Sequence, residues 1–249
     1  MATELLRVPR KLIVVISTAL HAMSTPPVAA QIEAALRPLA DGVQAVPMRA
    51  YMLNQFAFFG IRATVRRQAL RGLPKLGSWT ALELLALADK LWDLPEREFQ
   101  YVAVDLLAKY HRQLGPDSVA HLLQLVQRKP WWDTVDGLAG VVGDILLGAR
   151  PGQPDVQRTM DACLRHPSLW VRRVAMLHQL GWKADTDEVR LLRYALTLAS
   201  EPDFFIRKAI GWALRDYART RPEAVRAFLA QHVQRLSSLT RREAGKHLG

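Results

Sequence analysis

The segment Pro202–Arg215 reads PDFFIRKAIGWALR, and the period of its apolar residues is that of an amphipathic helix. At 100° per residue, one face of this helix is apolar and continues into the next turn. The residues of that face are Ile206, Ile210, Leu214 and Tyr217. Pro202 precedes the helix, and the same arrangement recurs through the chain.

Prolines stand before comparable helical segments at successive spacings of 35, 37 and 35 residues. They are Pro95, Pro130, Pro167 and Pro202. A second set of helix starts lies between them, at Pro116–Asp117, Pro154–Asp155, Asp187–Glu188 and Pro222–Glu223, and a further unit follows at 236–248. Paired helices at this period are typical of a HEAT-like α-solenoid. With no alternating run long enough for a strand, the sequence predicts an all-α fold, a curved stack whose extended surface suits a polymer.

Equivalent positions of the repeats bring charged residues together. The sixth residue after each of the last three prolines is Asp136, Arg173 and Lys208. If the repeats stack in parallel, these residues lie along one surface, with Arg173 and Lys208 as the neighbours of Asp136. One carboxylate in a row of cations is either a structural ion pair or an active-site acid, and the register leaves both interpretations open.

Trp212 lies nearly opposite Ile210, on the polar side of its helix. Its neighbours on the helical wheel are Lys208, Arg215 and Arg219. Such an indole either packs against a neighbouring repeat or stays exposed in a basic groove, where it can meet a sugar or base. We favour the exposed indole. Gly211 leaves room beside it for a close backbone approach.

The segment Lys129–Asp136 reads KPWWDTVD, with two Trp and two Asp close together. Taken alone, it favours a helix that Pro130 opens, with Asp133 in the positive first turn and the Trp pair packed in a core. The alternative is a carboxylate held beside indole faces, which can stabilise a cation.

The charge balance indicates a polyanionic partner. Lys and Arg number 34 against 23 Asp and Glu, a net charge of +11 with pI near 10.3, which suits nucleic acid or an acidic membrane surface. The single cysteine, Cys163, excludes an internal disulfide and suits a reducing cytoplasm. The sequence contains no zinc-ligand spacing, dinucleotide fingerprint or P-loop, so we expect neither a metal nor a cofactor.

Residues 1–23 differ from the rest. Basic residues precede the apolar run Leu12–Leu20 (LIVVISTAL), which is too short to cross a bilayer as a helix, and Met23 opens a more natural start. We expect residues 1–23 to be an extension, disordered or a mis-assigned start, with no part in function. Residues 24–249 are expected to form the functional domain.

Several motifs, in order, resemble the bacterial DNA alkylation repair glycosylases of the AlkD type. They are Tyr51–Ile61 (YMLNQFAFFGI), Leu91–Gln100 (LWDLPEREFQ), Trp131–Asp136 (WWDTVD), Leu169–Ala175 (LWVRRVA), Phe204–Arg215 and Thr240–His247 (TRREAGKH). The resemblance covers about residues 30 to 249. It implies a HEAT-like solenoid whose concave, basic face cradles duplex DNA and engages a lesion without the usual flipping of the base.

The resemblance also implies site residues. The catalytic Asp of the family maps onto Asp136 and its two functional Trp onto Trp132 and Trp212, while Trp131 is left to pack between helices. The groove Arg maps onto Arg173 and an aromatic near the lesion onto Tyr51. We expect Lys208 and Arg215 to hold phosphates beside Arg173.

The predicted function is therefore a monofunctional glycosylase of base excision repair. It would excise cationic N3- and N7-alkylated purines, such as 3-methyladenine and 7-methylguanine, from duplex DNA. No Lys stands out as a Schiff-base nucleophile, so we expect no lyase step. We expect a monomer in the bacterial cytoplasm, associated with the nucleoid and not with a membrane. The rival is a non-catalytic HEAT-repeat protein that binds DNA structures or a protein partner.

Overall fold

The computed structural model describes residues 28–150, 152–153 and 156–248. Within these residues every regular element is helical, and the one β-type contact is an isolated bridge between Ala57 and Glu96. The predicted all-α class is therefore confirmed. None of the described helices has the length and apolar character needed to cross a membrane. The prediction for residues 1–23 lies outside the described residues.

The chain forms two compact units, residues 1–106 and 107–249, and the boundary falls inside one helix, α5. In the first unit residues 28–36 are helical. The elements that follow are η1 (Arg37–Leu39), α2 (Gly42–Tyr51), α3 (Ala63–Ala69), α4 (Ala81–Asp93) and α5 (Arg97–Lys109).

A buried carboxylate fixes the loop before α3. Glu98, fully buried in α5, accepts hydrogen bonds from three consecutive backbone N–H groups, those of residues 59–61, at 2.9 to 3.1 Å. Gly60 in this loop has φ of +91°, and a Cβ there would lie 2.1 Å from the carbonyl oxygen of Asp41. Asp41 in turn caps α2 through Val43 N–H and Gln44 N–H. Because Glu98 fixes the loop that packs against Asp41, it also positions α2, the helix that ends at Tyr51.

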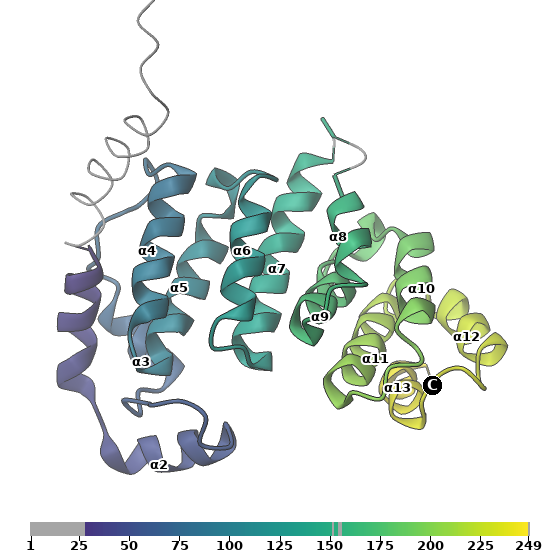
Figure 1. Cartoon of the computed structure of the whole chain (residues 1–249), viewed down its shortest axis with the longest axis horizontal. Coiled ribbons are helices and arrows are strands. Elements are labelled where there is room, and N and C mark those ends of the chain that lie inside the picture. The colour runs from purple at the N-terminus through teal and green to yellow at the C-terminus, as the bar shows by residue number, and fades with distance from the viewer. Residues whose placement is uncertain (1–27, 151, 154–155, 249) are drawn as a thin grey trace, which may run out of the picture. The chain divides into compact units, whose positions relative to one another are not determined.

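The second unit consists of paired helices (Figure 1). They are α6 (Ser118–Gln127), α7 (Trp132–Ala149), α8 (Arg158–Cys163), α9 (Leu169–Leu177), α10 (Glu188–Thr197), α11 (Phe204–Ala218), α12 (Pro222–Gln231) and α13 (Ser238–Ala244), with short turns η2 (His111–Gln113), η3 (Lys183–Asp185) and η4 (Gly245–His247). The second helices of the pairs pack in series, α7 on α9, α9 on α11 and α11 on α13. The first helices α6, α8, α10 and α12 pack beside them, as a HEAT-like stack requires.

The predicted helix starts are confirmed. Helices α5, α7, α9 and α11 each begin two residues after their proline. In α11 the residue between is an N-cap, since Asp203 accepts from Phe205 N–H at 2.7 Å and Ile206 N–H at 3.2 Å. The starts of α6, α10 and α12 fall where the second set was expected. The start expected at 154–155 lies outside the described residues, and α8 begins at Arg158.

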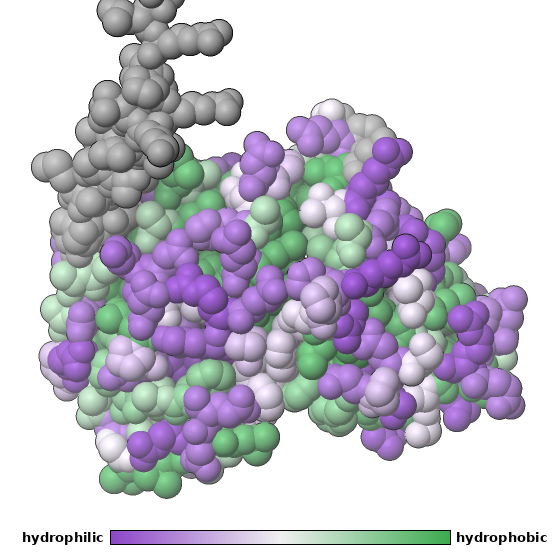
Figure 2. Space-filling model, viewed as in Figure 1, coloured by the Kyte–Doolittle hydropathy of each residue, from purple (hydrophilic) through white to green (hydrophobic). Residues whose placement is uncertain are grey.

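The core of the second unit is built on the face that the helical period predicts. In α11 all four residues of the predicted apolar face are buried, at 0 to 5% exposure. In the first unit, by contrast, α2 and the turn after it expose apolar side chains, with Val43 79% and Leu53 68% exposed. This apolar surface over α2 is visible as a green region at the lower left of Figure 2.

Candidate active site

Asp136 of α7 and Arg173 of α9 form a two-point ion pair. Arg173 donates from Nε to Oδ1 and from Nη2 to Oδ2 of the carboxylate, both at 2.7 Å. Its Nη1 donates to the carbonyl oxygen of Phe205 in α11. The Arg173 side chain is 1% exposed and that of Asp136 is 22% exposed. The contact with Arg173 predicted from the repeat register is therefore confirmed, whereas Lys208, the other predicted neighbour, pairs with Glu243. The carboxylate is the member of the Asp136–Arg173 pair that reaches solvent.

The electrostatics of Asp136 are set by three opposing effects. Burial raises the pKa of its carboxyl, the guanidinium of Arg173 lowers it, and the charge of Asp133 in the same helix raises it again. The net pKa lies above the ordinary value for aspartate. A poorly solvated carboxylate of this kind gains more than a surface carboxylate when a positive charge forms beside it.

Trp212 of α11 lies among cations, as the helical wheel predicts. The charged groups of Arg173, Lys208 and Arg215 lie 5.4, 5.5 and 5.9 Å from the centre of the indole. The indole is only partly exposed, because its Nε1–H donates to Glu243 of α13 at 3.2 Å. The structure thus combines the two interpretations of the sequence: the ring lies in a basic environment and also packs against the neighbouring helix.

Glu243 collects the cations around Trp212. Its side chain is 4% exposed and pairs with Lys208 at 3.0 Å, Arg215 at 3.3 Å and Lys246 at 2.9 Å. Burial raises the pKa of Glu243, but the hydrogen bonds from Lys246 and Lys208 outweigh this effect. The resulting pKa is about 2. The sequence patterns do not single out Glu243. The available signal was its position three residues before Lys246 in a motif that carries the resemblance.

An aromatic cluster packs beside Arg173, whose guanidinium lies 6.0 Å from the centre of the Phe205 ring. The ring of Trp131 lies 5.7 Å from that of Trp170 and 5.1 Å from that of Phe205, and the latter two are 5.0 Å apart. The prediction that Trp131 packs between helices is confirmed. The cluster fixes Phe205, whose carbonyl oxygen receives Arg173. Trp132, the first residue of α7, is partly exposed and lies four residues before Asp136, on the same helical face.

Tyr51 belongs to the first unit. It is 70% exposed at the end of α2. Leu53 and Asn54, just beyond it, have φ of 54° and 56°, a left-handed conformation that costs roughly 1–2 kcal/mol per residue. Strain of this kind is more often found at ligand-contacting segments than elsewhere.

Six of the seven predicted site residues lie in the second unit. Their helices are α7, which carries Trp132 and Asp136, α9, which carries Arg173, and α11, which carries Lys208, Trp212 and Arg215. Among the described residues, no group of three or more His, Cys, Asp and Glu side chains is arranged to hold a metal ion.

Fold and site together define an α-helical repeat protein with an oriented carboxylate, whose arginine partner lies with two further cations around an indole. The sequence profile of the family described as DNA alkylation repair enzyme matches residues 32–248, and the chain belongs to that family. A solved structure of a predicted DNA alkylation repair enzyme from Enterococcus faecalis is similar, with a TM-score of 0.74 and 30% identity over 84% of this chain and 96% of that chain. No curated protein matches the sequence.

Proposed function

We propose that this member of the DNA alkylation repair family is a monofunctional glycosylase that excises cationic N3- and N7-alkylated purines from duplex DNA. The observation that carries the proposal is the Asp136 carboxylate. Burial raises its pKa, two hydrogen bonds from Arg173 fix its orientation, and part of it reaches solvent. Preorganised charge of this kind stabilises an opposite charge that develops in a transition state.

The leaving group explains why one carboxylate suffices. Enzymes that hydrolyse glycosidic bonds commonly use one carboxyl group to protonate the leaving group and another to assist the sugar. An N3- or N7-alkylated purine is already cationic, so it leaves as a neutral base when it takes the electron pair of the broken N-glycosidic bond. Asp136 then stabilises the oxocarbenium-like sugar and orients the water that forms the new bond to C1′ and loses a proton.

The neighbouring side chains receive the rest of the nucleotide in this proposal. Trp212 and Trp132 offer indole faces to the sugar and its developing charge. Lys208 and Arg215 hold phosphates, since their side chains are 23% and 26% exposed. For Arg173 we propose a role different from the direct phosphate contact expected from the sequence, because its three nitrogens are directed to Asp136 and Phe205. It positions the carboxylate.

We further propose that the lesion stays largely within the duplex, that Tyr51 contacts the DNA, and that 3-methyladenine and 7-methylguanine are substrates. The reaction needs only DNA and water, so we expect no cofactor and a monomeric enzyme acting on nucleoid DNA in the bacterial cytoplasm.

Asp136→Asn tests the proposal. The amide keeps a hydrogen-bond acceptor for Arg173 but removes the negative charge. Single-turnover release of 7-methylguanine from duplex DNA should fall by about 10²–10³-fold. Duplex affinity and the thermal unfolding midpoint are measured in parallel, and we expect them to show that the variant still binds DNA and still folds. Full excision by this variant would overturn the assignment.

Base release and the salt dependence of duplex binding, measured together on the wild-type protein, separate the rival functions. A wild-type protein that binds duplex DNA with a steep salt dependence but releases no base would be a DNA-structure binder. A protein with no salt-dependent duplex affinity would be a protein scaffold.

A further inference from the structure

One buried carboxylate in the last repeat receives four donors from around the candidate site. Glu243 of α13 accepts from Trp212 Nε1 at 3.2 Å, Lys208 Nζ at 3.0 Å, Arg215 Nη1 at 3.3 Å and Lys246 Nζ at 2.9 Å. Three of these donors come from α11, and Lys246 comes from η4. The side chains that we propose to meet the DNA backbone therefore share a single anchor.

The packing of α11 against α13 places Glu243 close to the axis of α11. A Cβ on Gly211 would lie 2.5 Å from Cβ of Glu243 and 3.1 Å from the carbonyl oxygen of Thr240. Thr240 also donates from Oγ1 to the carbonyl oxygen of Arg207, at 3.0 Å. The close approach that Gly211 permits is thus made by α13, at the turn of α11 that carries Trp212.

The charge of Glu243 has a specific consequence for the cluster. Lys208, Arg215 and Lys246 carry three positive charges against its one negative charge, so the group keeps a net charge of +2. The carboxylate holds cations together that would otherwise repel one another, and the remaining positive charge still attracts phosphate. A buried pair of this kind is weak evidence for stability, but it does fix geometry.

We infer that Glu243 is a positioning residue of the excision site. By accepting the Nε1–H of Trp212, it sets the rotation of the indole, because turning the ring about its Cβ–Cγ bond breaks that hydrogen bond. By pairing with Lys208 and Arg215, it keeps both cations beside the ring. This inference rests on the proposed function and extends it to α13, which contributes no group that touches the sugar.

The test is a double-mutant cycle between Glu243→Gln and Trp212→Phe. Phenylalanine keeps an aromatic ring but has no N–H to donate. Glu243→Gln should slow single-turnover excision of 7-methylguanine by about tenfold, and it should slow the Trp212→Phe variant by no more than about twofold, because the two residues act together. Additive losses would show that Glu243 does not act through Trp212 and would overturn the inference.

Duplex affinity separates positioning from a general structural role. Glu243→Gln removes a negative charge beside three cations, so the variant should bind undamaged duplex at least as tightly as the wild type while excising more slowly. A variant that merely loses its fold would lose binding and excision together, and that outcome also overturns the inference.

Asp161→Asn supplies the matched control. Asp161 likewise receives several donors, with Arg193 at 2.6 Å and the Tyr194 hydroxyl at 2.7 Å, but it belongs to α8 and not to the site. This variant should excise at the wild-type rate. If wild-type protein releases base and Glu243→Gln does so equally fast, only the inference fails. If wild-type protein releases none, the proposed function itself fails.

Discussion

At Asp136, the desolvation cost of a charge and the attraction of a partner oppose each other. Burial and Asp133 raise the pKa, Arg173 lowers it, and the net result is a raised pKa. The pair is arranged asymmetrically, since the cation is 1% exposed while the carboxylate is 22% exposed. Arg suits the buried position because its planar fork can satisfy both carboxylate oxygens and still donate to a carbonyl.

Replacing Arg173 with Met should move the pH dependence of excision to higher pH. Without the cation, only the effects that raise the Asp136 pKa remain, so the carboxyl group takes up its proton at a higher pH. Since the ionised form is the active one, the rate falls as pH falls through this pKa. The midpoint should shift upward by about one unit or more, measured as single-turnover rates from acid to alkaline pH.

Arg173→Lys is the control for that shift. It keeps a positive charge near Asp136 but cannot make the two-point contact, so its midpoint should lie closer to that of the wild type. An unchanged midpoint in Arg173→Met would mean that the rate does not depend on the ionisation of Asp136.

At the scale of elements, close contacts between a helix and its neighbour depend on three glycines, Gly143, Gly211 and Gly60, and an added Cβ on Gly143 of α7 would lie 2.0 Å from the carbonyl oxygen of His178. Gly211 admits α13 to the surface of α11, as described above. Gly60 admits the loop before α3 to the N-terminus of α2, with φ of +91° and no room for a Cβ beside Asp41. Each contact lies beside a helix that carries a predicted site residue, Trp212 in α11 and Tyr51 in α2.

Gly60→Ala should lower the free energy of unfolding by about 3 kcal/mol, because alanine must adopt a left-handed conformation and its Cβ overlaps a carbonyl oxygen. Gly148→Ala, in α7 with nothing within 4 Å of the added Cβ, should instead raise it by about 0.5–1 kcal/mol. Urea denaturation followed by circular dichroism measures both. Equal stability of Gly60→Ala and the wild type would contradict the structure of this loop.

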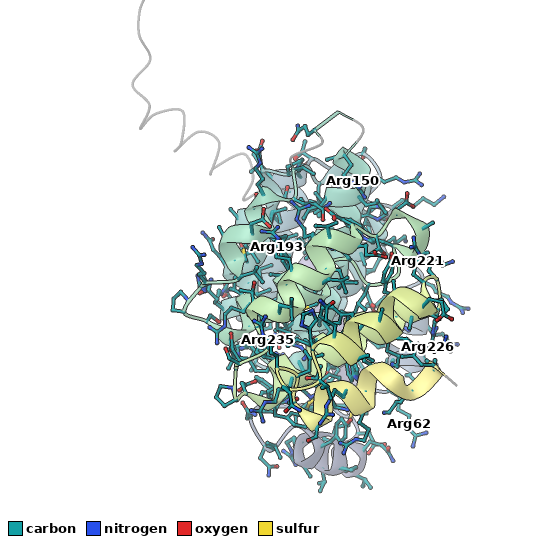
Figure 3. The ribbon with its side chains drawn as sticks, turned by 90° about the vertical axis from the view of Figure 1, so that its right-hand side faces the viewer. Arg62, Arg150, Arg193, Arg221, Arg226 and Arg235 are labelled. Carbon is teal, nitrogen blue, oxygen red and sulfur yellow. The ribbon has the colours of Figure 1, made fainter. Side chains whose placement is uncertain are left out.

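At the scale of the whole molecule, the net charge of +11 overstates the number of cations that can face phosphates. The arginines labelled on the second unit in Figure 3 illustrate this. Arg150 donates to the carbonyl oxygen of Asp185 at 2.6 Å, Arg193 pairs with Asp161 at 2.6 Å, and Arg235 donates to the carbonyl oxygen of Leu196 at 3.4 Å. The salt dependence of DNA binding should therefore reflect a few contacts.

Arg215→Ala should reduce the magnitude of the salt slope of duplex binding by about 0.9, the value of one phosphate contact, and should weaken damaged and undamaged duplex equally. The measurement is the logarithm of affinity against the logarithm of salt concentration. Arg226→Ala serves as the control, since Arg226 lies in α12, outside the helices α7, α9 and α11 that carry the site residues of this unit, and its slope should equal that of the wild type. An unchanged slope for Arg215→Ala would remove it from the predicted interface.

The sequence by itself determined what repeats and what is local. The proline spacing located the helix starts, the 100° period gave the buried face of α11, and the repeat register paired Asp136 with Arg173. Each of these depends on a few neighbouring residues or on a count from the proline before each helix, so they can be predicted without coordinates. The resemblance supplied the expected roles, which register and period do not contain.

Only the tertiary structure decided how these residues are used. The burial of Arg173 depends on how closely α9 packs against α7 and α11, which no local pattern specifies. The bond from Trp212 to Glu243 joins residues 31 positions apart, and it exists because α13 closes on α11 at Gly211. The distance between side chains on successive helices depends on how closely those helices pack. Their contacts are therefore fixed only when the whole stack is assembled.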